Sequence, residues 1–236
     1  MADKKYLVVA IEGTIGSGKS TLADELGEEL GPNTLVLQEP DERGGANPYL
    51  GDFYEDMARW AFTMQVHLLQ SRWRLHRLAQ EYAMSGRGHA IIDRSAPGDT
   101  AFARLQVKTG AMTEREFATY GKLYHAMTEV MLLPNICIRL LVDPHVALER
   151  IQKRADARAG RKCEVGISID YLKSLDREIS HMTEVLRRQG VMVLDTPWDV
   201  DKYTSEDRSR AVKGLSSRLQ EWVPPDPFLD LHRRTV

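Results

Sequence analysis

A glycine-rich stretch near the start of the chain has the residue types and spacing of a phosphate-binding loop. Residues 13–20 read Gly-Thr-Ile-Gly-Ser-Gly-Lys-Ser, between an apolar run and a stretch with helical periodicity. Glycine permits a tight turn, so that N–H groups at the helix start can point at phosphate oxygens. The pattern predicts a nucleoside triphosphate site made by Gly13, Thr14, Ile15, Gly16, Ser17, Gly18, Lys19, Ser20 and Thr21.

Two side chains of this loop have separate expected roles. Lys19 should reach the β- and γ-phosphates, and the Ser20 hydroxyl should ligate Mg²⁺. The motif alone says only that a triphosphate binds. A regulatory GTPase would need an Asn-Lys-x-Asp loop, and none of the asparagines of the chain (Asn33, Asn47 and Asn135) lies in one.

Carboxylates follow two further apolar runs. The apolar run at residues 89–93 ends at Asp93 and is followed by Arg94-Ser95. The aspartate can hold the metal, and the arginine can neutralise charge near a transferred phosphoryl group. Residues 34–38 lead into Glu39-Pro40, and Glu39 could accept the proton of an acceptor hydroxyl. A surface ion pair and a solvated glutamate are the alternatives. The arrangement favours a small kinase over a motor ATPase.

A polar stripe is expected on the helical stretch at residues 48–85. At about 100° per residue, Tyr54, Ala61, Gln65 and Arg72 share one face if the helix is continuous. Burying these polar groups without partners would cost a few kcal/mol each, whereas a polar ligand would satisfy them. The stripe therefore indicates an acceptor-binding face, with a solvated helix surface as the alternative.

A basic segment at residues 149–164 could close over the triphosphate. It contains six cationic residues: Arg150, Lys153, Arg154, Arg158, Arg161 and Lys162. We expect a lid at about residues 150–166, in which Arg150, Arg154 and Arg158 contact the ATP phosphates and Arg154 also stabilises charge during transfer. The alternative is a solvated helix end whose cations suit the helix dipole.

The elements that must position these residues alternate along the chain. Apolar runs at residues 6–12, 34–38, 89–93, 136–142 and 191–195 predict parallel strands. Helical periodicity fills the intervals, near residues 19–30, 48–85, 97–108, 113–131, 144–157, 168–189 and 205–222. We expect an α/β fold with a doubly wound five-stranded parallel sheet, one domain over residues 1–223 and a proline-containing tail at 224–236.

The overall composition is that of an ordinary globular protein. The 236 residues are 42% hydrophobic and 28% charged, with a net charge of −2, so nothing favours a nucleic acid or a membrane as partner. The apolar run at residues 7–11 is too short for an export signal or a membrane span, which predicts a cytoplasmic protein. Cys137 and Cys163 are expected to be a core thiol and a surface thiol, not a disulfide or a zinc site.

Together these motifs resemble the deoxynucleoside kinase family, of the deoxycytidine, deoxyguanosine and deoxyadenosine kinase type. The resemblance rests on the loop at residues 11–21, on Glu39-Pro40, on Arg-Trp-Ala-Phe-Thr-Met-Gln at residues 59–65 and on Asp93-Arg94-Ser95. It runs to about residue 190 and implies a homodimer that transfers the γ-phosphoryl of ATP, or another nucleoside triphosphate, to a deoxynucleoside with Mg²⁺ as cofactor.

The resemblance also implies roles for individual residues. Glu39 would be the general base for the 5′-hydroxyl, with Arg94 close to it, and Tyr54 and Glu164 would hold the 3′-hydroxyl. Gln65 would bind the base. Arg72 and Asp99 match a pair that relatives acting on deoxycytidine and purine deoxynucleosides place over the base, which favours one of those acceptors.

Two other functions stay open on the sequence alone. A nucleoside monophosphate kinase of the thymidylate kinase type shares the loop, a Glu-Pro and an Asp-Arg, but needs extra cations for the acceptor phosphate. Residues 41–56 offer only Arg43 against several acids. A non-catalytic nucleotide-binding switch would use the loop without the other candidate residues.

Overall fold

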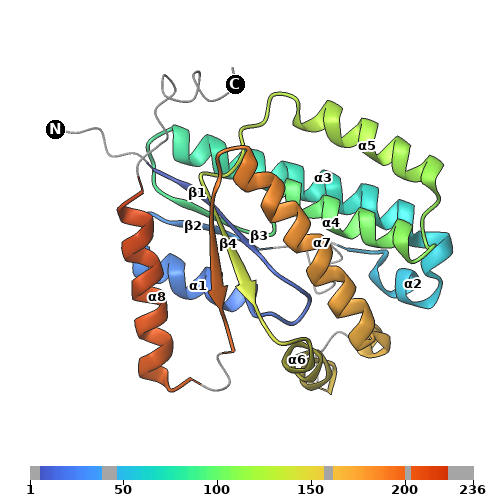
Figure 1. The fold of residues 1–236 in the computed structure, drawn as a ribbon. Helices are drawn as coiled ribbons and strands as arrows, with labels where there is room; N and C mark the ends of the chain where they lie inside the picture. Colours follow the sequence, from blue (N-terminus) through green and yellow to red (C-terminus); the bar gives the residue numbers. More distant parts are fainter. Residues whose placement is uncertain (1–5, 39–46, 157–161, 200–202, 223–236) are drawn as a thin grey trace.

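The computed structural model describes residues 6–38, 47–156, 162–199 and 203–222 (Figure 1). Glu39, Arg158 and the tail at residues 224–236 lie outside these ranges, as does part of the expected lid.

A five-stranded parallel sheet forms the centre of the described part of the chain, as the sequence predicts. The strands lie in the order β2-β3-β1-β4-β5, and each neighbouring pair is parallel. Their bounds are β1 (Val8–Glu12), β2 (Leu35–Leu37), β3 (Ala90–Asp93), β4 (Ile136–Leu141) and β5 (Met192–Pro197). The carboxyl ends of β1 and β3 lie side by side, with Ile11 in register with Asp93.

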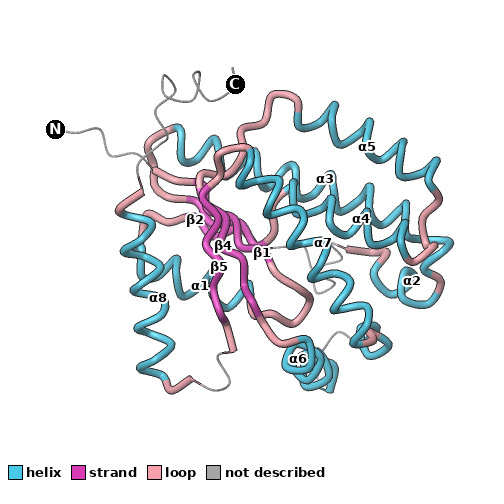
Figure 2. The backbone as a smooth tube through the Cα atoms, viewed as in Figure 1, coloured by secondary structure: helices cyan, strands magenta, loops and turns pink. Residues whose placement is uncertain are grey.

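Helices cover both faces of this sheet (Figures 1 and 2). Side chains alternate between the faces along β1, so Val9 packs toward α1 (Lys19–Leu30) and α8 (Ser205–Gln220), whereas Val8 packs toward α3 (Met57–Met84). The remaining helices are α2 (Leu50–Glu55), α4 (Ala96–Lys108), α5 (Glu114–Thr128), α6 (Pro144–Asp156), the 3₁₀ helix η2 (Lys162–Gly166) and α7 (Ile169–Arg188). The prediction of helices on both faces is confirmed.

One predicted helix is wrong in its continuity. The stretch at residues 48–85 divides into α2 and α3 at Asp56, whose backbone leaves the helical region at φ −142° and ψ 83°. The Asp56 carboxylate accepts a hydrogen bond of 3.0 Å from the Arg59 N–H group and so caps the start of α3. Tyr54 therefore does not share a continuous helix face with Gln65 and Arg72.

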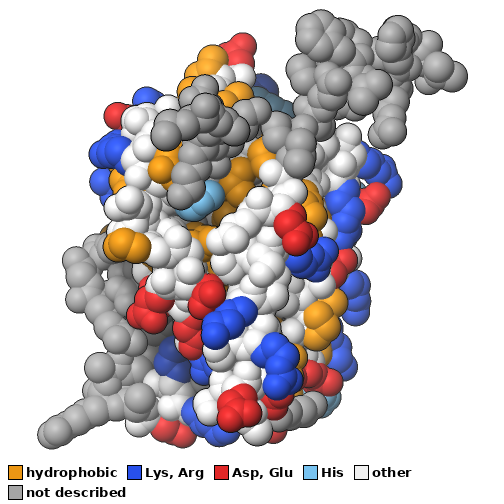
Figure 3. Space-filling model, turned by 90° about the vertical axis from the view of Figure 1, so that its left-hand side faces the viewer, with side chains coloured by type: hydrophobic (Ala, Val, Ile, Leu, Met, Phe, Trp, Pro, Cys, Tyr) orange, Lys and Arg blue, Asp and Glu red, His pale blue; other side chains and the backbone are white. Residues whose placement is uncertain are grey.

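The surface and the cysteines agree in part with expectation. In the described residues no helix combines the length and the apolar character that crossing a bilayer requires. The face shown in Figure 3 mixes acidic and basic side chains over most of its described area.

Cys137 is a free, buried thiol as predicted, but Cys163 is half-buried against the apolar cluster around Phe53 instead of lying exposed.

The buried His76 on α3 predicts a pH dependence of stability. Burial lowers the pKa of His76 to about 4, while an unfolded histidine titrates near 6.5. The unfolded chain therefore binds the extra proton first, so the free energy of unfolding should fall as pH drops from about 6.5 to 4, by about 3 kcal/mol in total. Urea unfolding at several pH values should show that the free energy of unfolding falls less with decreasing pH in His76→Gln than in the parent protein. The same dependence on pH in the two proteins would contradict this.

Candidate active site

The loop between β1 and α1 has the backbone that phosphate binding requires. Gly16 and Gly18 have φ angles of 77° and 92°, a region that L side chains rarely adopt. A β-carbon on Gly16 would also lie 2.5 Å from the Ala147 carbonyl oxygen of α6. Gly18 directly precedes α1, so the first N–H groups of that helix open toward the loop. The geometry therefore depends on glycine at both positions.

Polar side chains line this loop. Lys19 is 7% exposed, and its Nζ donates a 3.0 Å hydrogen bond to the Thr14 carbonyl oxygen, across the loop. The Ser17 hydroxyl is buried and has no hydrogen-bond partner among the described residues. An ammonium and a hydroxyl donor placed in such a loop suit bound phosphate oxygens.

Ser20 and Asp93 meet, as the metal prediction requires. The Ser20 hydroxyl donates a 2.5 Å hydrogen bond to Asp93 Oδ2, and Asp93 Oδ1 is buried without a partner in the described part of the chain. Within the same residues no group of three or more Asp, Glu, His or Cys side chains could form an all-protein metal site. Mg²⁺ commonly takes only one or two protein oxygens and completes its shell with phosphate and water, so this pair fits it.

A cavity beside the loop contains most of the predicted acceptor residues. Its walls come from the loop, from α2, α3 and α4, from the end of β3 and from η2 and α7. The lining residues are Ile15, Asn47, Leu50, Phe53, Tyr54, Met64, Leu68, Arg72, Arg94, Phe102, Glu164 and Tyr171. Tyr54 reaches it from α2, so the break at Asp56 still leaves Tyr54 and Arg72 on one cavity. The volume is about 60 Å³, below the roughly 300–1,000 Å³ of ligand pockets, so its walls must separate to admit a nucleoside.

Gln65 and Asp99 lie behind the cavity wall, in a buried polar network. Arg72 forms an ion pair with Asp99, and the Tyr120 hydroxyl donates a 2.6 Å hydrogen bond to Asp99 Oδ2. Gln65 Nε2 donates to the Asp99 carbonyl oxygen at 3.2 Å, while its Oε1 is buried without a partner in the described residues. Burial, followed by the Asp99 charge, raises the pKa of Tyr120, so its hydroxyl stays a donor. The network fixes the orientation of the Arg72 guanidinium at the cavity wall.

The described part of the lid touches both the loop and the cavity. Arg154 on α6 forms an ion pair with Glu164 of η2, which is 3% exposed, and η2 contacts α2. Arg150 donates hydrogen bonds of 3.2 Å to the carbonyl oxygens of Ser17 and Trp198. Arg150 thus lies beside the phosphate loop with hydrogen bonds to backbone oxygens, and its contact with ATP phosphates stays a prediction.

Two residues that the sequence did not single out belong to this region. Asn47 lines the cavity at 5% exposure, and its Oδ1 has no partner in the described residues. Glu12, at the end of β1, is fully buried beside Arg94. A charged residue closing an otherwise apolar strand was the available signal for Glu12, whereas Asn47 had only its place before the tyrosine-containing helix.

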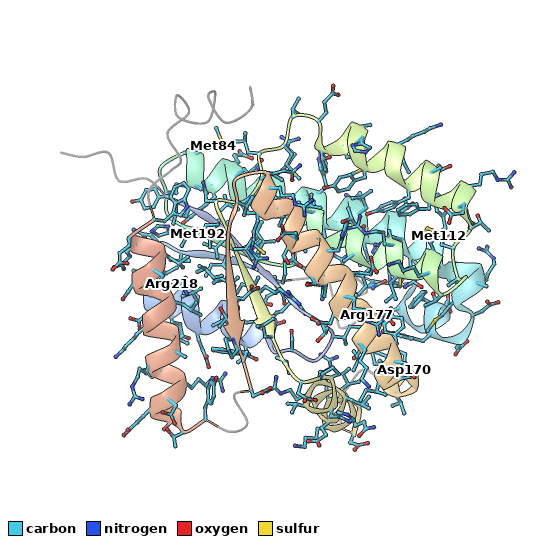
Figure 4. All side chains as sticks on the ribbon, viewed as in Figure 1. Met84, Met112, Asp170, Arg177, Met192 and Arg218 are labelled. Carbon is cyan, nitrogen blue, oxygen red and sulfur yellow. The ribbon has the colours of Figure 1, made fainter. Side chains whose placement is uncertain are left out.

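Figure 4 labels residues on both helical layers of the fold. Met112 packs into the apolar cluster around Leu50 and Met64 that backs the cavity, while Arg218 lies on α8 across the sheet. Asp170 and Arg177 lie along α7, the helix that contributes Tyr171 to the cavity. The predicted site residues that the structure describes lie at the phosphate loop, around the cavity or directly behind the cavity wall.

The fold and the loop are those of a P-loop α/β protein. A family model described as deoxynucleoside kinase matches residues 9–217, which is most of the chain. The chain belongs to the deoxynucleoside kinase family.

Individual relatives agree with this membership. The chain is 36% identical to a deoxyadenosine kinase of Dictyostelium discoideum over 167 residues, which cover 71% of this chain and 62% of that protein. It is 34% identical to a deoxyadenosine/deoxycytidine kinase of Bacillus subtilis over 174 residues, covering 72% and 74%. The chain thus spans less than two thirds of the Dictyostelium relative. In fold it is similar to a deoxyadenosine kinase from M. mycoides with bound dATP, with a TM-score of 0.72, 22% identity and coverage of 92% and 100%.

Proposed function

We propose that this protein transfers the γ-phosphoryl group of ATP, or of another nucleoside triphosphate, to the 5′-hydroxyl of a deoxyribonucleoside. One observation carries the proposal. Ile15 of the phosphate loop and Arg94 from the end of β3 line the same cavity as Tyr54, Arg72 and Glu164. A triphosphate in the loop and an acceptor in the cavity would therefore be neighbours, which is what direct transfer between them needs.

The residues of the chain supply binding, charge stabilisation and proton transfer. Lys19 binds the β- and γ-phosphates, and Arg94 with the lid arginines Arg154 and Arg158 offsets negative charge on the transferred group. Ser20 and Asp93 hold Mg²⁺, which when bound neutralises phosphate charge. Glu39 accepts the proton of the 5′-hydroxyl. The roles of Glu39 and Arg158 rest on the sequence.

The acceptor is proposed to be a purine deoxynucleoside or deoxycytidine. A guanidinium with a fixed orientation, such as that of Arg72 held by Asp99, can make two parallel hydrogen bonds to a base edge. Gln65 would bind the base once the walls separate, and Tyr54 and Glu164 would bind the 3′-hydroxyl. Relatives named as deoxyadenosine, deoxyguanosine and deoxyadenosine/deoxycytidine kinases support this choice.

The charges on the cavity wall disfavour a nucleoside monophosphate as acceptor. Of the described lining residues, Arg72 is paired with Asp99, and the carboxylate of Glu164 is paired with Arg154. A dianionic phosphate would have to compete with Asp99 and Glu164 for these cations. An uncharged sugar hydroxyl does not face this competition.

A substrate panel tests the function. The purified protein would be assayed with Mg²⁺ and either ATP or GTP on deoxyadenosine, deoxyguanosine, deoxycytidine, thymidine and the matching monophosphates. Formation of 5′-monophosphates from the first three nucleosides is expected, with little product from thymidine. Diphosphate formation from the monophosphates, with no reaction of any nucleoside, would overturn the proposal.

The base preference should depend on the pair of Arg72 and Asp99. Because removing Arg72 alone would leave a buried carboxylate unpaired, the test variant is the double substitution Arg72→Met with Asp99→Asn. We expect kcat/KM for the preferred purine deoxynucleoside to fall by about 10–100-fold, the value of one charged hydrogen-bonding group, with a smaller loss for thymidine. Equal losses for all acceptors would show that the pair does not read the base.

The assembly and location of the protein are proposed from the family resemblance. We propose a cytoplasmic homodimer built from a single kinase domain, with residues 224–236 as a tail outside that domain. Light scattering after size-exclusion chromatography would give the mass directly, and a monomer at working concentration would contradict the dimer.

A further inference from the structure

Glu12 is a buried carboxylate that no step of the proposed mechanism uses. It ends β1, is 0% exposed, and lies against the start of α4. Its Oε1 accepts hydrogen bonds from the Ser95 N–H group at 2.8 Å and from the Ser95 hydroxyl at 2.7 Å. Ser95 is the N-cap of α4 and in turn accepts a 3.2 Å bond from the Gly98 N–H group. One carboxylate oxygen of Glu12 thus stabilises, through Ser95, the turn that contains Arg94.

The start of α4 is shaped to admit this carboxylate. A β-carbon on Gly98 would lie 2.4 Å from both carboxylate oxygens of Glu12, closer than any real contact. Gly98 is inside the helix, where glycine costs up to about 1 kcal/mol relative to alanine. The close approach of Glu12 explains a glycine at this position.

The second oxygen of Glu12 faces Arg94. Arg94 Nη1 lies 4.0 Å from Glu12 Oε2, and Oε2 accepts no hydrogen bond from the described residues. On another side the Arg94 guanidinium lies 4.4 Å from the centre of the Phe102 ring, within cation–π distance. Arg94 is also the only non-glycine residue in the described ranges with positive φ, at 70°. A carboxylate, an aromatic ring and an unusual backbone together orient this side chain.

Keeping a charge at Glu12 works against stability. Burial raises the pKa of the Glu12 carboxyl group, while Arg94, Ser95 and Arg72 act in the opposite direction. The two hydrogen bonds that Ser95 donates could also be accepted by an amide oxygen, which would not bury a charge. The charge itself therefore has to be explained by Arg94, which lines the acceptor cavity.

We propose that Glu12 is a positioning residue whose negative charge holds the Arg94 guanidinium at the cavity wall, where it meets the transferred phosphoryl group. This inference rests on the proposed function. Glu12 contacts neither substrate and acts through Arg94. Hydrogen bonds from Ser95 and the space left by Gly98 hold its carboxylate in place.

The variant Glu12→Gln separates the charge from the local structure. The amide keeps the shape of the side chain and an acceptor for Ser95, so the protein should stay folded, although the melting temperature should fall because the buried Arg94 loses the carboxylate beside it. Because Arg94 loses its electrostatic partner, kcat should fall by about 10²-fold, the cost of misplacing a reacting group by about 1 Å. KM for both substrates should change by less than about threefold, since an interaction needed only in the transition state is lost.

A double-mutant cycle shows whether the effect passes through Arg94. In the Arg94→Lys background, Glu12→Gln should cause little further loss of kcat, because the residue that it positions is already altered. Independent, multiplicative losses from the two substitutions would overturn the inference. So would a normal kcat in Glu12→Gln, or an equal loss of kcat in the control variant Glu178→Gln.

Glu178→Gln is the matched control. Glu178 is also a buried carboxylate, 4% exposed, but it pairs with Arg104 and Lys108 away from the cavity. The Glu178→Gln variant should also lose stability but should keep kcat, unlike Glu12→Gln. A parent protein that phosphorylates no deoxynucleoside would reject the proposed function, whereas an active parent with an unaffected Glu12→Gln variant would reject only the positioning role.

Discussion

Replacing Lys19 with alanine is expected to lower kcat by about 10³-fold while the protein stays folded. The ammonium is the cation built into the phosphate loop, and removing one preorganised charge-stabilising donor costs about 10²–10³-fold in comparable sites. Its hydrogen bond to the Thr14 carbonyl oxygen is the structural contact that alanine would remove. Steady-state kinetics with saturating ATP and deoxynucleoside, together with circular dichroism, would measure both parts of the prediction.

The control for this variant is Lys213→Ala, which removes an exposed lysine from α8. It should leave kcat and the melting temperature unchanged. If Lys19→Ala kept more than about a tenth of the parent kcat, the loop would not carry the charge stabilisation assigned to it.

Replacing Glu39 with glutamine should lower kcat by about 10²–10⁴-fold, the usual contribution of a general base. Glutamine keeps the size of the side chain but cannot accept the proton of the 5′-hydroxyl. Because residue 39 is not part of the phosphate-loop motif at residues 13–20, ATP should still bind, as isothermal titration calorimetry would show. Glu29→Gln, at an exposed position of α1, is the control expected to keep full activity. Near-normal turnover of the Glu39 variant would remove this residue from the mechanism.

The sequence predicted the scaffold well because its signals are local and strong. Continuous apolar runs such as that around Val9 occur where a parallel strand is covered on both faces. The glycine pattern around Gly16 and Gly18 reflects positive φ angles that few other residues adopt. Ser20 in the first turn of α1 and Asp93 at the end of β3, each assigned to the metal from its motif, are joined by a hydrogen bond.

The parts that the sequence did not predict depend on tertiary contacts. The break at Asp56 came from a single capping carboxylate inside a stretch with helical periodicity. Asp99 is buried with Arg72 and Tyr120 as side-chain partners, which joins α3, α4 and α5, and no spacing along one helix reveals this contact. Glu12 was read only as the last residue of an apolar run, because its partner Ser95 lies 83 positions away in the sequence.

The most direct test of the account is a crystal structure of the protein with a non-hydrolysable ATP analogue, Mg²⁺ and deoxyadenosine. We predict the analogue in the loop at Lys19 and the nucleoside in the cavity between Tyr54, Arg72 and Arg94. The 5′-oxygen should lie about 3–3.5 Å from the γ-phosphorus, as a near-attack geometry requires. A nucleoside bound elsewhere, or an Arg72 face open to bulk solvent in that complex, would contradict the account.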